Sequence, residues 1–355
     1  MENKPNFERF RKSMYLQQSD RVPLAEVLIS DQVKSKFLGK EVKDHDMESQ
    51  VEFWSRACYD FIPIVVGMLG PGRVTDAAKI YAIVKHSLFE DSDKTKGWAA
   101  EGRGIITTVE EFEKFPWVSA DDLDYSKFDE VQKYLPQGMK IIAVSGKIFT
   151  ITWILMGFEV FCMSFIQNEA LISNLFEKIG TIQFESFKKV IDKPNIGAVW
   201  VVDDVAYDAG LMVSPKYLRT YLFPWYQRMA MICKERNIPF IFHSDGNLWK
   251  IMDDIVALGA NAVHPIEPKA MDINEVKRKY GDKLALIGNI EVDKLTRGTK
   301  EEVIKEVKKR IKEIGPGGGY CIGSSNSIPE WMNYDNYIAM IEAVLRYGNY
   351  PINID

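Results

Sequence analysis

The stretch IFHSDGNLWK, residues 241–250, changes abruptly from apolar to polar side chains. Ile241 and Phe242 are typical of a buried strand, and His243 and Asp245 follow, two residues apart. Because alternate residues of a strand point to the same side, both polar groups can reach one bound atom. An imidazole beside a carboxylate can hold a metal ion or move a proton. The stretch therefore predicts a catalytic or metal-binding site.

Other polar groups stand at the ends of similar apolar runs. They are Asp203 with Asp204, His264 with Glu267, Asn289 with Glu291, and Ser324, Ser325 and Asn326. Each has a structural alternative, since acids can cap helices, a histidine before proline is often buried for packing, and Asn or Glu can hydrogen-bond a turn. Cys321 lies within its run, roughly 16 Å of extended chain before Asn326, so we expect it in the core.

Eight apolar runs organise the chain, and helical stretches separate most of them. The runs are 22–29, 60–67, 139–146, 196–204, 238–246, 260–268, 283–291 and 318–325. Unbroken apolar runs suit strands that are buried on both faces, as in parallel sheets. They predict an α/β fold, a single closed (β/α)8 TIM barrel over residues 1–355. A doubly wound open sheet is the alternative, but no GxGxxG follows the first run.

Barrel enzymes carry their reacting groups where strands end and the following loops begin, which is where the polar groups described above lie. One interval, residues 68–138, breaks the alternation. Its segments 82–90 and 102–108 predict a hairpin excursion between the second and third strands. Farther along, Asp272 with Glu275 and Thr299 with Glu302 predict capping boxes at two helix starts.

Composition excludes several classes of protein. The net charge is −5, the sequence pI is about 5.6, and basic residues alternate with acidic ones, which argues against a nucleic-acid-binding surface. The four cysteines form no CxxC pair, which indicates reduced thiols rather than a disulfide framework. The polar N-terminus and the absence of a long apolar run predict a cytoplasmic protein with no membrane segment.

Several long motifs resemble the uroporphyrinogen decarboxylase superfamily. They are GKIFTITWILMGFEVF (146–161), the segments 199–226 and 239–273, KLALIGNIEVD (283–293) and GGYCIGSSNSIPEWMNYDNYIAMIEAV (318–344). The resemblance covers nearly the whole chain and implies a (β/α)8 barrel with its site at the C-terminal mouth. The superfamily contains decarboxylases and cobalamin-dependent methyltransferases, so the resemblance alone does not settle the reaction.

Decarboxylation of a porphyrinogen is the weaker interpretation. Its substrate carries many carboxylates and calls for arginines, and the family's decarboxylases have an arginine-bearing segment after the first strand. The corresponding segment here contains Glu26 and Asp31 but no arginine. The decarboxylases also carry a histidine in the last motif, where this chain has Asn326.

Methyl transfer suits the residues better, because the leaving heteroatom must be stabilised by a Lewis acid or a proton donor. The coenzyme M methyltransferases bind zinc through His-x-Cys and a later Cys, and these positions fall on His243, Asp245 and Asn326. Only the histidine is retained, which argues against thiol activation. We predict a zinc site formed by His243, Asp245 and Glu267. The alternative is that the acids orient His243 by hydrogen bonds and that His243 donates the proton without a metal.

The sequence therefore predicts a methyltransferase of the O-demethylase type, which moves a methyl group from a small methylated substrate, such as a phenyl methyl ether, to cobalamin. No cobalamin-binding Asp-x-His-x-x-Gly segment is present, so the cobalamin should arrive on a separate corrinoid protein. The alternatives are a uroporphyrinogen decarboxylase, a thiol methyltransferase and a non-catalytic docking subunit, and the oligomeric state stays open, with a homodimer as one option. The predicted catalytic residues are His243, Asp245, Asp204 and Asn326, and the predicted substrate-binding residues are Glu26, Trp153, Phe158, Tyr207, Asn289 and Trp331.

Overall fold

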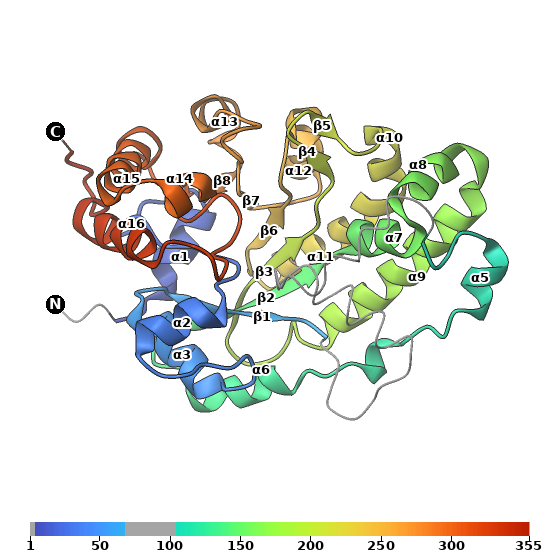
Figure 1. The fold of residues 1–355 in the computed structure, drawn as a ribbon, viewed down its shortest axis with the longest axis horizontal. Helices are drawn as coiled ribbons and strands as arrows, with labels where there is room; N and C mark the ends of the chain where they lie inside the picture. Colours follow the sequence, from blue (N-terminus) through green and yellow to red (C-terminus); the bar gives the residue numbers. More distant parts are fainter. Residues whose placement is uncertain (1–3, 68–103, 355) are drawn as a thin grey trace.

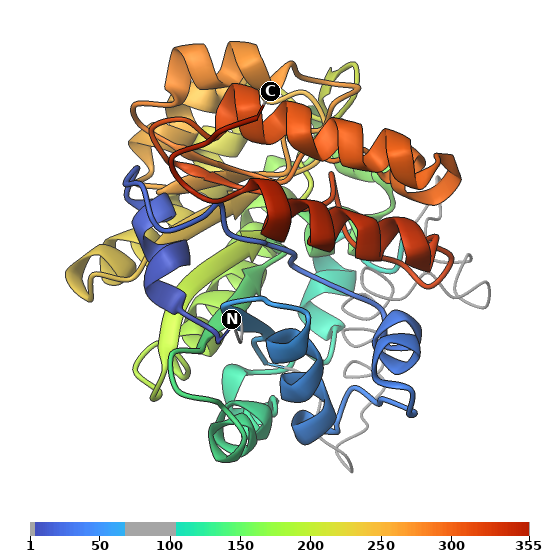
Figure 2. The same cartoon turned by 90° about the vertical axis from the view of Figure 1, so that its left-hand side faces the viewer.

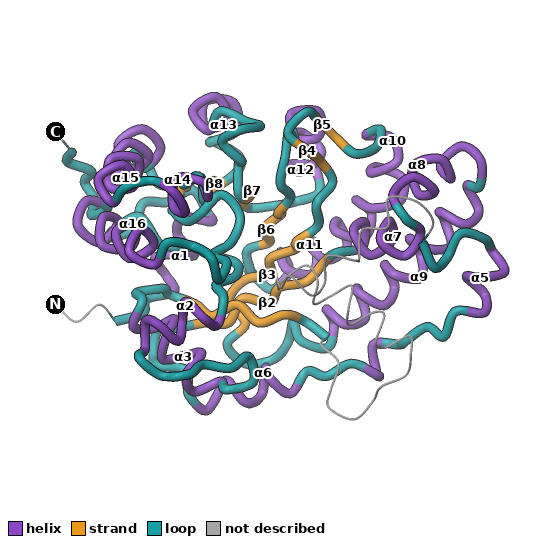
Figure 3. The backbone as a smooth tube through the Cα atoms, viewed as in Figure 1, coloured by secondary structure: helices purple, strands orange, loops and turns teal. Residues whose placement is uncertain are grey.

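A computed structural model describes residues 4–67 and 104–354, and its centre is one parallel sheet (Figures 1 and 3). In the described residues this sheet has seven strands in the order β1-β2-β3-β6-β7-β8-β9, and every neighbouring pair is parallel. The strands are β1 (Phe61–Val65), β2 (Lys140–Gly146), β3 (Ile196–Val202), β6 (Phe240–His243), β7 (Ala262–His264), β8 (Ala285–Ile287) and β9 (Tyr320–Cys321). Each of the last seven predicted runs contains one of these strands, so the parallel α/β architecture is confirmed.

The first predicted run, 22–29, does not form a regular strand. It lies beside the β9 edge, where Leu24 and Ile29 make isolated parallel bridges to Ile322 and Ile328. Two backbone hydrogen bonds, from Ala25 N to Ile322 O and from Ile322 N to Pro23 O, fix this register at 2.8 and 2.9 Å. Among the described residues no backbone hydrogen bond joins the run to β1. The structure therefore shows a curled seven-stranded sheet, and closure into an eight-stranded barrel stays a prediction.

Helices cover the outer face of this sheet (Figure 2). Before β3 they are α1 (Phe7–Met14), α2 (Asp31–Leu38), α3 (Met47–Arg56), α5 (Val109–Lys114), α6 (Ser126–Glu130), α7 (Ile148–Met156), α8 (Phe158–Gln167) and α9 (Glu169–Lys188). After it come α10 (Pro215–Tyr217), α11 (Phe223–Glu235), α12 (Met252–Ala257), α13 (Ile273–Tyr280), α14 (Val292–Arg297), α15 (Lys300–Ile314) and α16 (Tyr334–Tyr347). Four short turns complete the set: η1 (Ala120–Asp122), η2 (Val131–Lys133), η3 (Leu218–Leu222) and η4 (Trp249–Ile251).

Helix starts follow local sequence signals. The predicted capping box at Thr299 and Glu302 is confirmed, because each side chain accepts a hydrogen bond from the backbone of the other. Asp272 also caps its helix, although its side chain accepts from Asn274 and the reciprocal bond from Glu275 is not formed. Such caps satisfy backbone N–H groups that have no partner within the helix.

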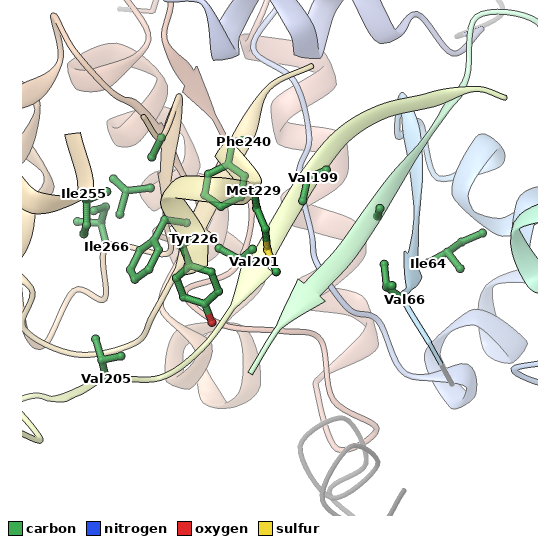
Figure 4. Close-up of a cluster of buried hydrophobic side chains, with 14 of the residues drawn as sticks. Ile64, Val66, Val199, Val201, Val205, Tyr226, Met229, Phe240, Ile255 and Ile266 are labelled. Carbon is green, nitrogen blue, oxygen red and sulfur yellow. The ribbon is translucent and has the colours of Figure 1, made fainter. Parts of the chain in front are cut away.

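Strand residues alternate between two hydrophobic clusters. On β3, Ala198, Trp200 and Val202 belong to the cluster enclosed by the curled sheet, whereas Val199 and Val201 pack toward the helices. Figure 4 shows Val199 and Val201 beside Tyr226 and Met229 of α11. This alternation, which follows from the two-residue period of a strand, decides which polar groups at the strand ends face inward.

Two connections differ from what the sequence predicts. A small antiparallel hairpin, β4 (Ala206–Tyr207) with β5 (Gly210–Leu211), follows β3 and was not predicted. The predicted hairpin between the second and third strands lies largely outside the described residues, since 68–103 are not described. Its described remainder, 104–138, contains α5, α6, η1 and η2 and no strand.

No single helix in the described residues is long and apolar enough to cross a membrane. The pair α7 and α8, bent by 97° at their junction, passes the same test of length and composition when both helices are taken together. Seven of the nine residues of α7 are buried in the fold.

Candidate active site

The centre of the polar ring is formed where β3, β6 and β7 end side by side. The ladder pairs Val202 of β3 with His243, and His243 with His264 of β7. Ile241 and Ala262, each two residues earlier, belong to the inner cluster, so both histidines continue the inner face. Asp204 follows β3 with the same parity as Val202 and also contacts His243.

Asp204, His243 and Asp245 form a carboxylate–imidazole cluster. His243 Nε2 lies 3.4 Å from Asp204 Oδ1 and 3.8 Å from Asp245 Oδ1. The backbone N–H of Asp245 donates to Asp204 Oδ1 at 3.0 Å, which fixes one acid relative to the other. One ligand atom from each of the three residues lies within 4.8 Å of the others, which is a spacing that can hold a metal ion. This cluster thus unites three of the predicted catalytic residues.

His264 lies against the other side of His243. The two Nδ1 atoms are 2.6 Å apart, and the rings stack with centroids 4.8 Å apart and planes inclined by 26°. Beneath them Trp200 meets His264 edge-on at 4.9 Å. His264 is fully buried, and its Nε2 has no hydrogen-bond partner in the structure. The sequence favoured a structural role for His264 and did not anticipate a direct contact with His243.

The cluster perturbs its own ionisation. Burial alone would lower the pKa of His243, but the hydrogen bond to Asp204 and the charges of both acids outweigh it and leave the pKa raised. Burial and the charge of His243 hold the pKa of His264 well below its usual value. Burial, reinforced by the charge of Asp204, raises the pKa of Asp245 to about 7. His243 and Asp245 therefore hold a proton more readily than ordinary side chains of their kind, and His264 holds one less readily.

Asn326 supports the cluster from the loop after β9. Its side-chain Nδ2 donates to Asp245 Oδ2, and its own oxygen accepts from Ser327. The second oxygen of Asp245, Oδ1, is buried and has no hydrogen-bond partner in the structure. Asn326 thus orients Asp245 and leaves Oδ1, the atom on the side of His243, available to a ligand.

The third member of the cluster is Asp204 rather than Glu267, which the sequence predicted as a metal ligand. Glu267 Oε2 accepts from the backbone N–H of Gly246 at 3.0 Å, and its carboxylate is not among the atoms that meet the ligand spacing. Burial raises the pKa of Glu267, and its charge in turn raises that of Asp245. Glu267 therefore acts on the cluster through its charge and through the loop that carries Asp245.

Asp203 serves a structural purpose, although it holds a helix that precedes it in the chain and does not cap the following segment, which was the alternative the sequence offered. Its carboxylate accepts from the backbone N–H groups of Phe149 and Thr150, both at 2.8 Å, from the Thr150 hydroxyl at 2.6 Å and from the Tyr226 hydroxyl at 2.5 Å. These contacts hold the first turn of α7 against the end of β3. Burial nevertheless raises the pKa of Asp203 to about 6.

Lys147 is a buried cation that the sequence reading missed. It stands between β2 and α7 with a left-handed backbone (φ 65°) and is 7% exposed. Its charge lowers the pKa of both Asp204 and His243. From the sequence alone, the lysine in the motif GKIF would be expected to be exposed to solvent. The left-handed turn between β2 and α7 places it near the cluster instead.

Comparison with known proteins identifies the family. A sequence profile described as uroporphyrinogen decarboxylase (URO-D) matches residues 108–347, more than half of the chain. The chain belongs to the uroporphyrinogen decarboxylase family. This confirms the resemblance predicted from the motifs.

Individual relatives in the URO-D family are more distant. Two curated proteins named uroporphyrinogen decarboxylase are similar: that of Pseudoalteromonas translucida (strain TAC 125) is 29% identical over 114 residues, which is 32% of this chain and 31% of that protein. That of Dechloromonas aromatica (strain RCB) is 31% identical over 105 residues, 29% of this chain and 28% of that protein. The chain thus aligns with less than a third of the length of each relative.

A solved structure shares the fold. A protein described as a methyltransferase from Methanosarcina mazei superposes with a TM-score of 0.64 at 14% sequence identity. The superposition covers 96% of this chain and 98% of that chain. At this identity the similarity concerns the fold, which is consistent with the barrel-like architecture of URO-D proteins.

Two predicted substrate-binding residues of this URO-D chain are buried. Glu26 is fully buried and accepts from the Ser324 N–H and hydroxyl at 2.6 and 2.8 Å. Its neighbours Ala25 and Val27 belong to the inner hydrophobic cluster. Burial raises its pKa to about 8. Asn289 is 1% exposed, donates to Ile266 O, and keeps its Oδ1 without a hydrogen-bond partner in the structure.

The predicted aromatic residues divide into two sets. Trp153, Phe158 and Tyr207 form a chain of ring contacts, with centroids 5.9 Å and then 6.2 Å apart. Tyr207, in the β4–β5 hairpin, is 53% exposed, and its carbonyl accepts from the N–H of Asn247, two residues after Asp245. This places the aromatic chain next to the loop that carries the cluster. Trp331 is 50% exposed.

Cys321 lies in the inner hydrophobic cluster. It is fully buried, and burial raises the pKa of its thiol, so it is protonated. This agrees with the prediction that Cys321 belongs to the core.

Proposed function

We propose that this URO-D family member is a corrinoid-protein-dependent methyltransferase that demethylates a small methylated compound, with phenyl methyl ethers as the donor class. The observation that carries the proposal is the Asp204–His243–Asp245 cluster, an acidic nitrogen/oxygen site at the carboxyl ends of the strands. The shared fold with a protein described as a methyltransferase supports it. We further propose that residues 22–29 complete an eight-stranded barrel.

The chain's own residues would stabilise the leaving group. When the methyl–oxygen bond breaks, the electron pair stays on the substrate oxygen, which needs a positive partner. His243 Nε2, held between two acids, can carry a proton toward that oxygen. The ring chain of Trp153, Phe158 and Tyr207 offers an apolar wall for an aromatic donor. A reduced corrinoid on the partner protein would supply the nucleophile that accepts the methyl group.

The cluster also fits a zinc ion. Imidazole nitrogen and carboxylate oxygen are accepted zinc ligands, and an open position for substrate is typical of catalytic sites. Asp245 Oδ1, buried and without a hydrogen-bond partner in the structure, is the atom that such an ion would satisfy. Bound there, zinc would act as a Lewis acid on the substrate oxygen. Direct proton donation by His243 is the metal-free alternative.

Porphyrinogen decarboxylation is the second candidate, because the curated relatives carry that name. A substrate with many carboxylates needs cationic partners. The charge of Lys147 lowers the pKa values of His243 and Asp204, whereas three acids, Asp204, Asp245 and Glu267, act on the cluster. The sign of the charge therefore favours methyl transfer. A thiol methyltransferase is less favoured, because the cluster has no thiolate.

Mixing the chain with a cobalt(I) corrinoid protein and separate methylated phenols, amines and thiols tests the proposal. We expect the visible spectrum of the corrinoid to report its methylation with a phenyl methyl ether. His243→Ala should slow the reaction by about 100-fold or more, and His45→Ala, at an exposed histidine, should leave it unchanged. Activity that persists in His243→Ala, or coproporphyrinogen formed from uroporphyrinogen, would contradict the proposal.

Absence of methylation with every donor and corrinoid protein would favour a docking role. The cytoplasmic location, the single-domain organisation and the oligomeric state stay predictions.

A further inference from the structure

His264 takes no part in the proposed chemistry, yet it makes the shortest contact of His243. The two Nδ1 atoms are 2.6 Å apart, a distance at which one must carry a proton and the other must accept it. The two acids of the cluster, Asp204 and Asp245, both contact the other ring nitrogen, Nε2. The direction of this one hydrogen bond therefore decides what Nε2 can do.

The two directions have different consequences. If His264 donates, a neutral His243 must keep its own proton on Nε2, and that atom has no lone pair for a metal ion. If His243 donates, Nε2 is free to bind a cation, and a protonated His243 still has an Nε2–H for the substrate oxygen. Metal binding needs the second direction, and so does proton donation by a protonated His243, because both of its ring nitrogens carry hydrogen.

We propose that His264 is a positioning residue, whose Nδ1 accepts the Nδ1–H of His243 and so commits Nε2 to the acid side of the cluster. The inference rests on the proposed function, which assigns the work to His243 Nε2. In many metal sites the far nitrogen of a histidine ligand donates to a carboxylate or a carbonyl. Here a second imidazole takes that place.

The surroundings hold His264 in position. Its strand pairs it with His243, its ring meets Trp200 edge-on, and no part of it is exposed. Gly288, directly after β8, lies beside the ring, because a Cβ there would stand 3.4 Å from His264 Cδ2. These contacts hold the ring of His264 against that of His243.

Nitrogen NMR of the imidazoles tests the direction directly, because the chain has only four histidines. We expect metal-free wild type to show a protonated Nδ1 in His243 and an unprotonated Nδ1 in His264. A proton on Nδ1 of His264 would overturn the inference, whatever the enzyme does. If the NMR result holds while no donor is demethylated, the proposed function fails and the positioning role stands.

A matched pair of variants tests the consequence. His264→Asn places an amide oxygen near the former Nδ1 and can still accept, whereas His264→Leu has a similar volume and cannot. We expect zinc affinity, measured by competition with a chromophoric chelator, to fall about 10- to 100-fold in the leucine variant and to be largely restored in the asparagine variant. Equal affinities in wild type and both variants would overturn the inference. Circular dichroism verifies that each variant is folded.

Discussion

Zinc binding at the cluster should weaken steeply as the pH falls below about 7. The metal needs an ionised Asp245 and an unprotonated His243 Nε2, so protons compete with it. Burial raises the pKa of Asp245 to about 7, and the charges of Asp204 and Glu267 add to that effect. His243 has a raised pKa as well, so both groups hold protons more tightly than they do in an unfolded chain.

The magnitude follows from the Asp245 value. Two pH units below a pKa of about 7, the displaced proton alone costs about 100-fold in zinc affinity, since each unit corresponds to about 1.4 kcal/mol. Well above that pKa, Asp245 is already ionised, and proton displacement no longer lowers the zinc affinity. His243 adds a second proton, so the slope of log affinity against pH should exceed one at acidic pH. Lys147 and Asn326 face the same groups: the charge of Lys147 lowers the pKa of His243, and Asn326 donates to Asp245 without ionising itself.

The measurement is a series of chelator competitions from pH 5 to pH 8.5. Asp245→Asn should lower the affinity at high pH and reduce the slope by about one proton. Glu267→Gln is the matched control, because its carboxylate lies outside the ligand spacing, and it should keep an acidic slope close to that of wild type. Affinity that does not change with pH, or a larger loss in Glu267→Gln than in Asp245→Asn, would refute the assignment of the cluster.

Three further predictions concern stability, measured by urea unfolding. Asp203→Ala should lower the free energy of unfolding by about 3 kcal/mol, because the buried donors of Phe149, Thr150 and Tyr226 lose their acceptor. An unchanged free energy of unfolding would refute the capping role. The pKa of Glu26 is raised to about 8 in the folded protein. The free energy of unfolding of wild type should therefore fall as the pH rises from about 4.5 to 8, by at most about 1.4 kcal/mol per pH unit. Glu26→Gln should remove this dependence. A slope that persists in Glu26→Gln would assign it to another group. Thr299→Ala should cost about 1 kcal/mol through loss of the capping box, and an unchanged midpoint would contradict that value.

Much of the architecture follows from local patterns. The runs that contain β2, β3 and β6 are apolar without alternation, because their two faces meet the inner cluster and the helices. The run 22–29 has the same composition but forms only bridges to the β9 edge. Composition reports that a segment is buried, whereas pairing depends on partners that are distant in the sequence.

Only the part of the site that lies within one segment could be predicted from the sequence. His243 and Asp245 belong to one segment, so their spacing shows that they share a side. Lys147 and His264 come from other strands, and their positions depend on register and on a left-handed turn, neither of which composition reveals. Glu26 was predicted to bind substrate, but it is fully buried and accepts from the Ser324 N–H, a contact between segments about 300 residues apart that composition does not reveal.

Asp204, and not the predicted Glu267, joins His243 and Asp245 in the cluster, and the strand register explains why. Both acids follow strands adjacent to β6, and neighbouring strands are about 4.8 Å apart, so distance between strands favours neither. Asp204 comes two residues after Val202, the register partner of His243, and so continues the inner face at the height of the imidazole. Glu267 comes three residues after His264, with the opposite parity and beyond the left-handed backbone of Ile266 (φ 51°), and its carboxylate binds the Gly246 N–H instead. Parity relative to the partner strand, rather than closeness in sequence to a strand end, therefore decides which acid contacts His243.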